Sequence, residues 1–110
     1  MPTIDIGGRT FAFQDSGARA GRPVVLFHGA PGSRLFGPDS TTAAGVRLIT
    51  FDRPGYGRSD PLVDRRVADT SRDVVALLDH LGIERAAVVG WSGGGPFAVA
   101  TAVHAAERVT

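Results

Sequence analysis

Residues 86–106 read AAVVGWSGGGPFAVATAVHAA, and this stretch decides the fold. A short apolar run, residues 86–89, predicts a strand, and the small and apolar residues 94–106 predict a helix. Between them lies the pattern Gly-x-Ser-x-Gly, so a strand, a sharp turn and a helix follow one another directly. Pro96 is compatible with the helix because it falls in the first turn. We therefore predict that Ser92 stands exposed on a strained turn at the helix N-terminus.

The glycines of this turn have predictable roles. Side chains two residues before and after the serine would collide in so sharp a turn, which accounts for Gly90 and Gly94. The helix dipole and the backbone N–H of Gly93 are placed to stabilise an oxyanion. Trp91 either lines a pocket or packs under a neighbouring loop.

Two other interpretations of the turn are weighed against this one. The first is a plain tight turn, and the second is a glycine loop that holds a nucleotide phosphate at the helix N-terminus. The nucleotide interpretation is disfavoured because the spacing Gly-x-Gly-x-x-Gly is not satisfied and no later strand supplies an acid for a ribose.

Two further apolar runs, residues 23–27 and 46–51, are predicted to be strands of a parallel sheet covered on both faces. Before them, residues 3–6 and 10–14 alternate weakly around a Gly-Gly turn, which predicts an exposed antiparallel hairpin. The alternation of strands and helices predicts an α/β fold with a mostly parallel sheet and an N-terminal antiparallel hairpin. We expect residues 1–110 to form a single, partial domain.

The clearest helix is predicted between the last two of these strands. Its apolar residues fall on one face at three- and four-residue spacing: Val67, Val74, Leu77, Leu78 and Leu81. Thr70 with Asp73 resembles a capping arrangement, Asp64 is an alternative cap, and Gly82 stands where a helix usually ends. Residues 37–44 give only a poor helical signal.

The loop after the first parallel strand reads His28-Gly29-Ala30-Pro31-Gly32-Ser33-Arg34. Its glycines, Gly29 among them, allow the backbone to approach a ligand, and the turning chain can direct the N–H of Ala30 towards Ser92. We expect His28 to orient this loop by hydrogen bonding rather than to transfer a proton.

A second loop, residues 51–61, follows the next strand and is rich in turn-forming residues. Asp52 and Arg53 are predicted to form a structural pair at the strand end. Arg34, the last residue of the first loop, is expected to be solvated or paired with an aspartate, with a substrate carboxylate as the alternative partner.

Together, these three loops closely resemble the N-terminal half of the α/β-hydrolase fold family, over essentially the whole chain. The resemblance implies that Ser92 is the nucleophile and that the amides of Ala30 and Gly93 form the oxyanion hole. It further implies hydrolysis through an acyl-enzyme, usually of carboxylic esters and sometimes of peptides, lactones or amides. Residues 28–32 resemble the prolyl aminopeptidase branch more weakly, and serine at position 92 disfavours a haloalkane dehalogenase.

In that family the catalytic base and acid follow the nucleophile, on later strand ends. Here the chain stops at Thr110, as residues 107–110 are expected to enter the next strand, so we expect a fold truncated after the helix that follows the nucleophile. His80 and His104 are expected to lie about 17 Å and 18 Å from Ser92. His104 with Glu107 is weak evidence for a metal pair, and no metal site is expected.

The truncation has a structural consequence and leaves an alternative function open. The strand at residues 86–89 is expected to become an apolar edge that favours self-association and marginal stability. A catalytically silent remnant or binding module of the same fold is therefore the alternative to a serine hydrolase.

Composition excludes several other classes of function. All twelve basic residues are arginine, and the chain has no lysine or cysteine. A Schiff-base enzyme, a phosphate-loop lysine, a thiol nucleophile, a disulfide and a cysteine metal site are thereby ruled out. The net charge is +1 and the arginines are dispersed, which disfavours nucleic acid and anionic membranes as partners. We expect a cytoplasmic protein that needs no cofactor and takes a small-molecule acyl substrate.

Overall fold

The computed structural model describes residues 2–30, 32–35, 37, 45–62 and 66–110. Its strands are β1 (Thr3–Ile6), β2 (Arg9–Gly17), β3 (Arg22–Phe27), β4 (Val46–Phe51) and β5 (Ala87–Gly90). Its helices are α1 (Val67–Leu81) and α2 (Gly95–His104), with 3-10 turns η1 (Ser92–Gly94) and η2 (Ala106–Arg108) on either side of α2. Of the stretch with a poor helical signal, residues 38–44 lie outside the described residues.

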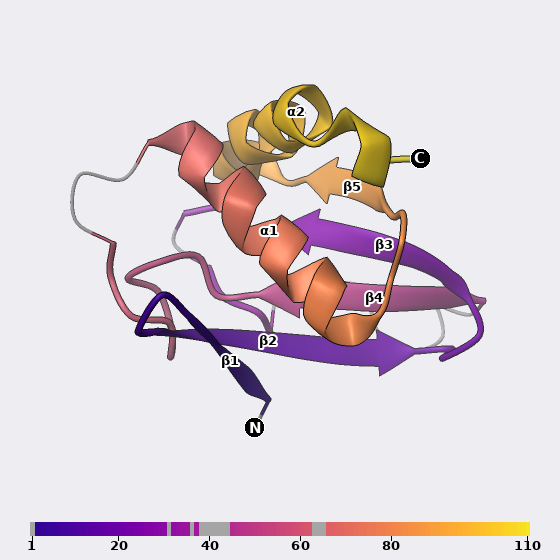
Figure 1. The fold of residues 1–110 in the computed structure, drawn as a ribbon, viewed down its shortest axis with the longest axis horizontal. Coiled ribbons are helices and arrows are strands. Elements are labelled where there is room, and N and C mark those ends of the chain that lie inside the picture. The colour runs from indigo at the N-terminus through magenta and orange to yellow at the C-terminus, as the bar shows by residue number, and fades with distance from the viewer. Residues whose placement is uncertain (1, 31, 36, 38–44, 63–65) are drawn as a thin grey trace.

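The five strands form one mixed sheet in the order β1-β2-β4-β3-β5. β2 pairs antiparallel with β1 and with β4, whereas β3 pairs parallel with β4 and β5. The arrowheads of β3, β4 and β5 point to the same side of the molecule (Figure 1). The three loops singled out in the sequence therefore follow the carboxyl-terminal ends of these parallel strands, on the same side of the sheet. The predicted α/β fold class is confirmed.

The predicted hairpin is present, but its second strand is not exposed. Phe11, Ala12 and Phe13 of β2 are buried, and the Phe11 ring stacks on Phe51 with the centroids 5.3 Å apart. The second loop covers this strand, because Ser59 Oγ accepts the Ala12 N–H at 2.9 Å. This pairing joins residues 47 positions apart, so the local alternation in the hairpin gave no sign of it.

One ion pair ties the two antiparallel inner strands together. The guanidinium of Arg47 in β4 donates to both carboxylate oxygens of Asp15 in β2, at 3.0 and 2.7 Å. Hydrogen bonding to this carboxylate raises the pKa of Arg47, against the opposing effect of burial. The arginine therefore keeps its charge within the sheet.

Helix α1 ends where predicted but begins differently. Gly82 adopts the left-handed conformation (φ 69°) and stops the helix. At the start, the Asp69 carboxylate accepts the N–H of Arg66 at 2.7 Å. The cap predicted at Thr70 and Asp73 is wrong: both residues are buried within the helix, and Asp73 forms an ion pair with Arg9 at 2.8 Å, which explains its position. The alternative cap, Asp64, lies outside the described residues.

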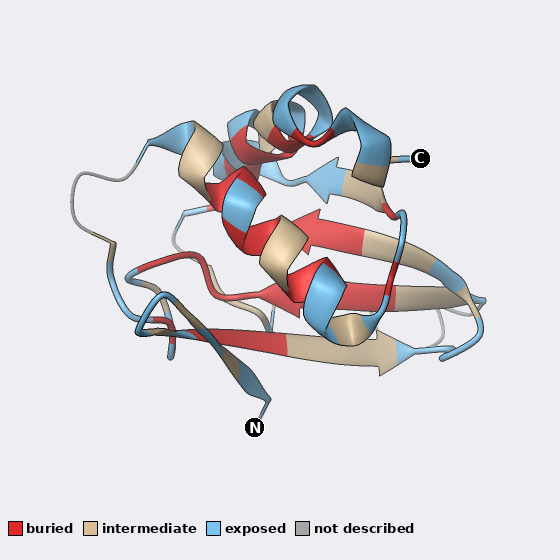
Figure 2. Ribbon diagram, viewed as in Figure 1, coloured by how far each residue is buried: buried red, intermediate tan, exposed pale blue. Residues whose placement is uncertain are grey.

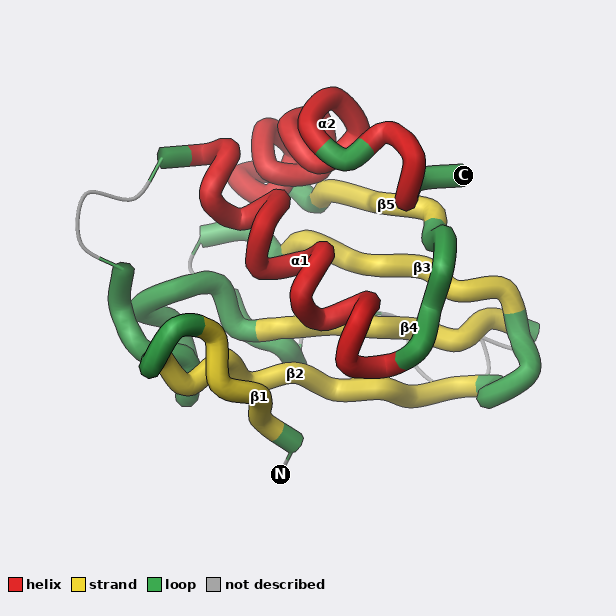
Figure 3. Tube along the Cα trace, viewed as in Figure 1, coloured by secondary structure: helices red, strands yellow, loops and turns green. Residues whose placement is uncertain are grey.

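Both helices cover one face of the sheet, with α1 crossing β3 and β4 and α2 lying beside it near β5 (Figure 3). Buried and exposed residues alternate along α1 (Figure 2), and its buried Val74, Leu77 and Leu78 share one core cluster with residues of the strands. The core between these layers contains fully buried side chains from both: Phe11, Val25, Phe27, Ile49, Phe51, Val74 and Leu77. Each such side chain contributes about 1.5–3 kcal/mol through burial.

Strand β5 forms the edge of the described sheet, and its Val89 is 48% exposed. At the start of β5, Ala86 forms a parallel bridge with Val109, and Thr110 N–H donates to the Ala86 carbonyl at 3.1 Å. Of residues 107–110, which were predicted to enter a strand, the first two belong to a 3-10 turn and Val109 makes the bridge. Within the described residues, neither helix has the length and apolarity needed to cross a membrane.

Truncating a core side chain at the centre of α1 should destabilise the fold strongly. Leu77 is fully buried, so Leu77→Ala should lower the free energy of unfolding by about 3 kcal/mol, through lost burial and the cavity left behind. Val99→Ala is the matched control because Val99, on α2, is 65% exposed, and its effect should stay within about 0.5 kcal/mol. Urea unfolding followed by circular dichroism measures both. Equal midpoint shifts for the two variants would contradict this packing.

Candidate active site

The turn between β5 and α2 places Ser92 at its tip. Ser92 has φ +49° and is the one non-glycine residue with a positive φ in the described part of the chain. A side chain in this conformation costs of order 1–3 kcal/mol, which the surrounding structure must offset. Ser92 is also exposed, so the strained and accessible serine predicted from the sequence is present.

Steric contacts explain why glycine occupies the two outer positions of the motif. A Cβ on Gly90 would lie 2.6 Å from Gly95 Cα. A Cβ on Gly94 would overlap the carbonyl oxygen of Phe27 and lie 2.7 Å from that of His28. The N-terminus of α2 therefore packs directly on the end of β3, at a distance that no side chain allows.

Gly93 and Ala30, from two different segments, lie next to one another beside the serine. The first hydrogen bond of the turn runs from Gly94 N–H to the Trp91 carbonyl at 2.8 Å, so among the described residues the amide of Gly93 stays outside the bonds of the turn. A Cβ built on Gly93 would lie 3.4 Å from the nitrogen of Ala30, and one on Gly29 would lie 3.5 Å from Ser92 Cβ. The first loop thus lies against the serine, with the amides of Ala30 and Gly93 close together. Such an arrangement can bind a developing oxyanion.

His28 is held inside the first loop. Its side chain is buried, and its Nε2 accepts the backbone N–H of Arg53 at 3.1 Å. Because Nε2 is an acceptor, the ring proton is on Nδ1, which donates to the Gly29 carbonyl at 2.7 Å. Both ring nitrogens are therefore engaged with backbone groups, as a loop-orienting role requires, and neither is available to Ser92.

Asp52 binds the first loop to the second, and its predicted pairing with Arg53 is wrong. Asp52 is fully buried, and its carboxylate accepts the backbone N–H and the guanidinium of Arg34, the latter at 2.8 Å. It also accepts the Arg58 N–H at 2.9 Å, and Gly57 packs so closely on it that no Cβ would fit. Successive residues at a strand end point in opposite directions, so Asp52 and its neighbour have different partners. The aspartate-paired alternative for Arg34 is the one observed.

Arg53 instead lies among aromatic rings that sequence reasoning missed. Its guanidinium carbon is 4.3 Å from the centroid of the Phe97 ring in α2 and 5.0 Å from that of Tyr56. The Tyr56 ring in turn meets the His28 ring edge-on, at 5.0 Å. The sole local signal was a tyrosine three residues after an arginine, since Phe97 is remote in sequence.

No side chain among the described residues is positioned to act as a general base for Ser92. Ser92 Oγ makes no hydrogen bond within them. His80 lies at the end of α1 with its ring edge-on to Phe13 at 5.9 Å. His104 is the last residue of α2, twelve positions and about 18 Å along the helix direction from Ser92. No group of three or more His, Asp or Glu side chains that could hold a metal, around Glu107 or elsewhere, occurs in the described ranges.

A family model described as the alpha/beta hydrolase fold matches residues 22–110. The chain belongs to this family. The match begins at the first residue of β3 and includes all three loops, so it covers every group of the candidate site.

Comparison with known proteins shows hydrolases of this fold. An uncharacterized hydrolase of Bacillus subtilis strain 168, YcgS, is 37% identical over 111 residues, covering 99% of this chain and 38% of that protein. A proline iminopeptidase of Xanthomonas citri is 38% identical over 103 residues, covering 84% of this chain and 31% of that protein. The enol-lactonase from Burkholderia xenovorans LB400 superposes with a TM-score of 0.87 at 26% identity, over 98% of this chain and 44% of that one. The chain spans less than two fifths of the length of these two curated relatives.

In this α/β-hydrolase chain, Trp91 lies on the first loop. Its Cδ1 is 3.3 Å from the position of a Cβ built on Gly29. The residue is nevertheless 59% exposed, so it is not buried under the loop. More than half of its surface is open next to Ser92.

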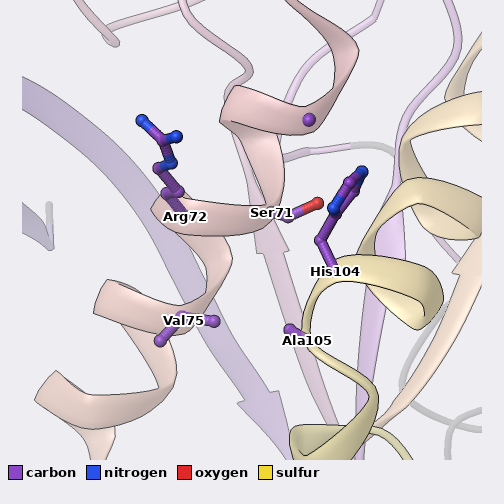
Figure 4. Close-up of a pocket in the computed structure, with 6 residues that line it drawn as sticks. Ser71, Arg72, Val75, His104 and Ala105 are labelled. Atoms are coloured by element: carbon purple, nitrogen blue, oxygen red, sulfur yellow. The ribbon is translucent and has the colours of Figure 1, made fainter.

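A cavity of about 410 Å³ lies elsewhere, between the two helices, and is lined by Ala68, Ser71, Arg72, Val75, His104 and Ala105. Ser71 and His104 face one another there from α1 and α2 (Figure 4). Ser71 Oγ lies 3.4 Å from Thr101 Oγ1, which itself donates to the Phe97 carbonyl at 2.8 Å, so these hydroxyls serve helix packing. Since Ser92 is at the other end of α2, this cavity is separate from the candidate site.

Two adjacent glycines should respond oppositely to alanine. Gly94→Ala forces a Cβ onto the carbonyl of Phe27 and should destabilise the protein by about 3 kcal/mol. Gly95→Ala is the matched control: Gly95 has helical dihedral angles (φ −55°, ψ −52°) and open space around the added Cβ. It should stabilise the protein by about 0.5–1 kcal/mol, because alanine loses less backbone entropy. Urea unfolding distinguishes them, and a Gly94→Ala protein as stable as the parent would refute the close approach of α2 to β3.

Proposed function

We propose that this chain carries the nucleophile and the oxyanion hole of a serine hydrolase that acts on a carboxylic ester or a related acyl substrate. One observation carries the proposal. An exposed serine on a strained turn lies at a helix N-terminus, beside the loop that brings the amide of Ala30 to that of Gly93. The membership in the α/β-hydrolase family and the hydrolase names of its relatives support the same reaction class.

In the proposed reaction, Ser92 Oγ attacks the acyl carbonyl carbon while a base removes its proton. The carbonyl oxygen becomes an anion, which the N–H groups of Gly93 and Ala30 and the positive end of the α2 dipole stabilise. Collapse of this intermediate breaks the bond to the leaving group, which departs with a proton and leaves an ester on Ser92. Water then attacks this acyl-enzyme by the same route and releases the acid.

The base and the acid belong, in this proposal, to segments other than the described residues. Both nitrogens of His28 are engaged in its loop, and His80 and His104 lie far from the serine. The chain spans 38% and 31% of two curated relatives, so most of the sequence of those proteins lies outside the matched segment. Iminopeptidase and enol-lactonase are the names of different relatives, so the shared segment supports acyl transfer without selecting a substrate.

A catalytically silent protein of the same fold is the second candidate. The observation that favours it is the hydroxyl of Ser92, which has no hydrogen-bond partner among the described residues. A serine without a base is a weak nucleophile. The two candidates differ in whether Ser92 reacts once a base is provided.

Chemical rescue with imidazole distinguishes the two candidate functions. The chain is treated with a fluorophosphonate in the presence and absence of imidazole, and adducts are followed by intact mass and located by peptide mapping. We expect one adduct on Ser92, formed at least about tenfold faster with imidazole, because added imidazole supplies the base that the described residues do not place near Ser92. Ser92→Ala should abolish the adduct, whereas Ser16→Ala, on β2, should leave it unchanged.

A folded sample that forms no adduct on Ser92 at any imidazole concentration would reject the hydrolase and favour the silent protein. Adducts spread over other serines would likewise show that the turn does not activate Ser92.

A further inference from the structure

Arg53 is a buried cation with no part in the proposed chemistry. Its side chain is 3% exposed, although the residue belongs to a surface loop. Its guanidinium lies over the Phe97 ring at 4.3 Å and over the Tyr56 ring at 5.0 Å. Cation–π contacts are stronger when water is excluded, as it is around this buried guanidinium.

The contacts of Arg53 connect three separate segments. Phe97 belongs to α2, five residues after the serine, whereas Tyr56 and Arg53 belong to the second loop. The Tyr56 ring meets the ring of His28 in the first loop, and Arg53 N–H donates to Nε2 of the same histidine at 3.1 Å. A continuous set of contacts therefore runs from the helix that follows Ser92 to the loop that carries Ala30.

We propose that Arg53 is a positioning residue for the oxyanion site. By stacking on Phe97 and bonding His28 through its N–H, it fixes the distance between the amides of Ala30 and Gly93. This inference rests on the proposed function, because it concerns the same site. Amide donors must be held within about 0.5 Å to be effective, and a misplacement of about 1 Å can lower the rate a hundredfold.

A planar guanidinium suits this position better than an apolar side chain. It stacks on aromatic faces, and its charge adds an attraction that an alkyl chain lacks. Arg53→Met keeps an unbranched chain between the rings and leaves the backbone N–H to His28 intact. It therefore removes the cation while the space stays filled.

The test compares oxygen and sulfur probes. A fluorophosphonate (P=O) and its thiophosphonate analogue (P=S) are reacted with Ser92 in the presence of imidazole, and the rates are measured by intact mass. Sulfur accepts hydrogen bonds weakly, so the P=S rate depends little on the amides. Arg53→Met should lower the P=O rate about tenfold and the P=S rate by no more than about twofold. General loss of stability would lower both rates equally.

Further variants test whether the effect of Arg53 comes from its contact with the Phe97 ring. Arg58→Met removes an exposed arginine of the same loop and should leave the P=O to P=S ratio unchanged. Arg53→Lys, which restores a cation without the planar group, should recover part of the ratio. Phe97→Leu should lower the ratio in the parent protein but have little further effect in Arg53→Met, since the two changes disrupt one contact.

Amide hydrogen exchange distinguishes failure of this inference from failure of the proposed function. Arg53→Met should accelerate exchange at residues 28–30 about tenfold and leave α1 unaffected. If the parent protein is labelled at Ser92 but the variant keeps the parent ratio, the positioning role is overturned and the hydrolase stands. If the parent is not labelled, the hydrolase fails and exchange decides: acceleration at residues 28–30 supports positioning by Arg53, and unchanged exchange overturns it.

Discussion

The contact of Gly94 with the end of β3 is the constraint on which the candidate site depends. With no Cβ at this position, the N-terminus of α2 reaches the carbonyl oxygens of Phe27 and His28. The chain must then reverse within a few residues of the end of β5, which forces Ser92 into a positive φ and leaves it exposed. The same contact sets the helix beside the first loop, so Gly93 lies next to the backbone nitrogen of Ala30. The absence of a side chain at Gly94 thus determines the positions of both the proposed nucleophile and the proposed anion site.

Buried polar groups fix the loops that this contact brings together. Asp52 is fully buried, and its carboxylate accepts the guanidinium of Arg34 from the first loop and the backbone N–H of Arg58 from the second loop, so it holds the two loops together. Removing one partner of a buried ion pair such as Asp52–Arg34 costs about 3–5 kcal/mol, because the remaining buried charge loses its partner and no water can take the place of that partner. His28 adds a second link between the loops through the N–H of Arg53. Loops without regular secondary structure thereby hold backbone donors in place.

Local patterns in the sequence predicted the elements and the turn, whereas the partners of polar side chains required the structure. The turn at Ser92 could be predicted because its strand, glycines and helix are contiguous. Asp52 was assigned to its sequence neighbour, but its cation lies eighteen positions earlier. Asp73 resembled part of a helix cap because its true partner, Arg9, is 64 residues away. Periodicity and capping signals act over a few residues, and neither reports contacts made when distant segments fold together.

The groups that would stabilise an oxyanion here are backbone groups. The amides of Gly93 and Ala30 and the dipole of α2 are positioned by the packing of Gly94, independently of which side chains supply the base or contact the substrate. Proton transfer and substrate selection are therefore separable from anion stabilisation and can change without disturbing it. Under the proposed function, this separation fits the similarity of the chain to proteins as different in name as a proline iminopeptidase and an enol-lactonase.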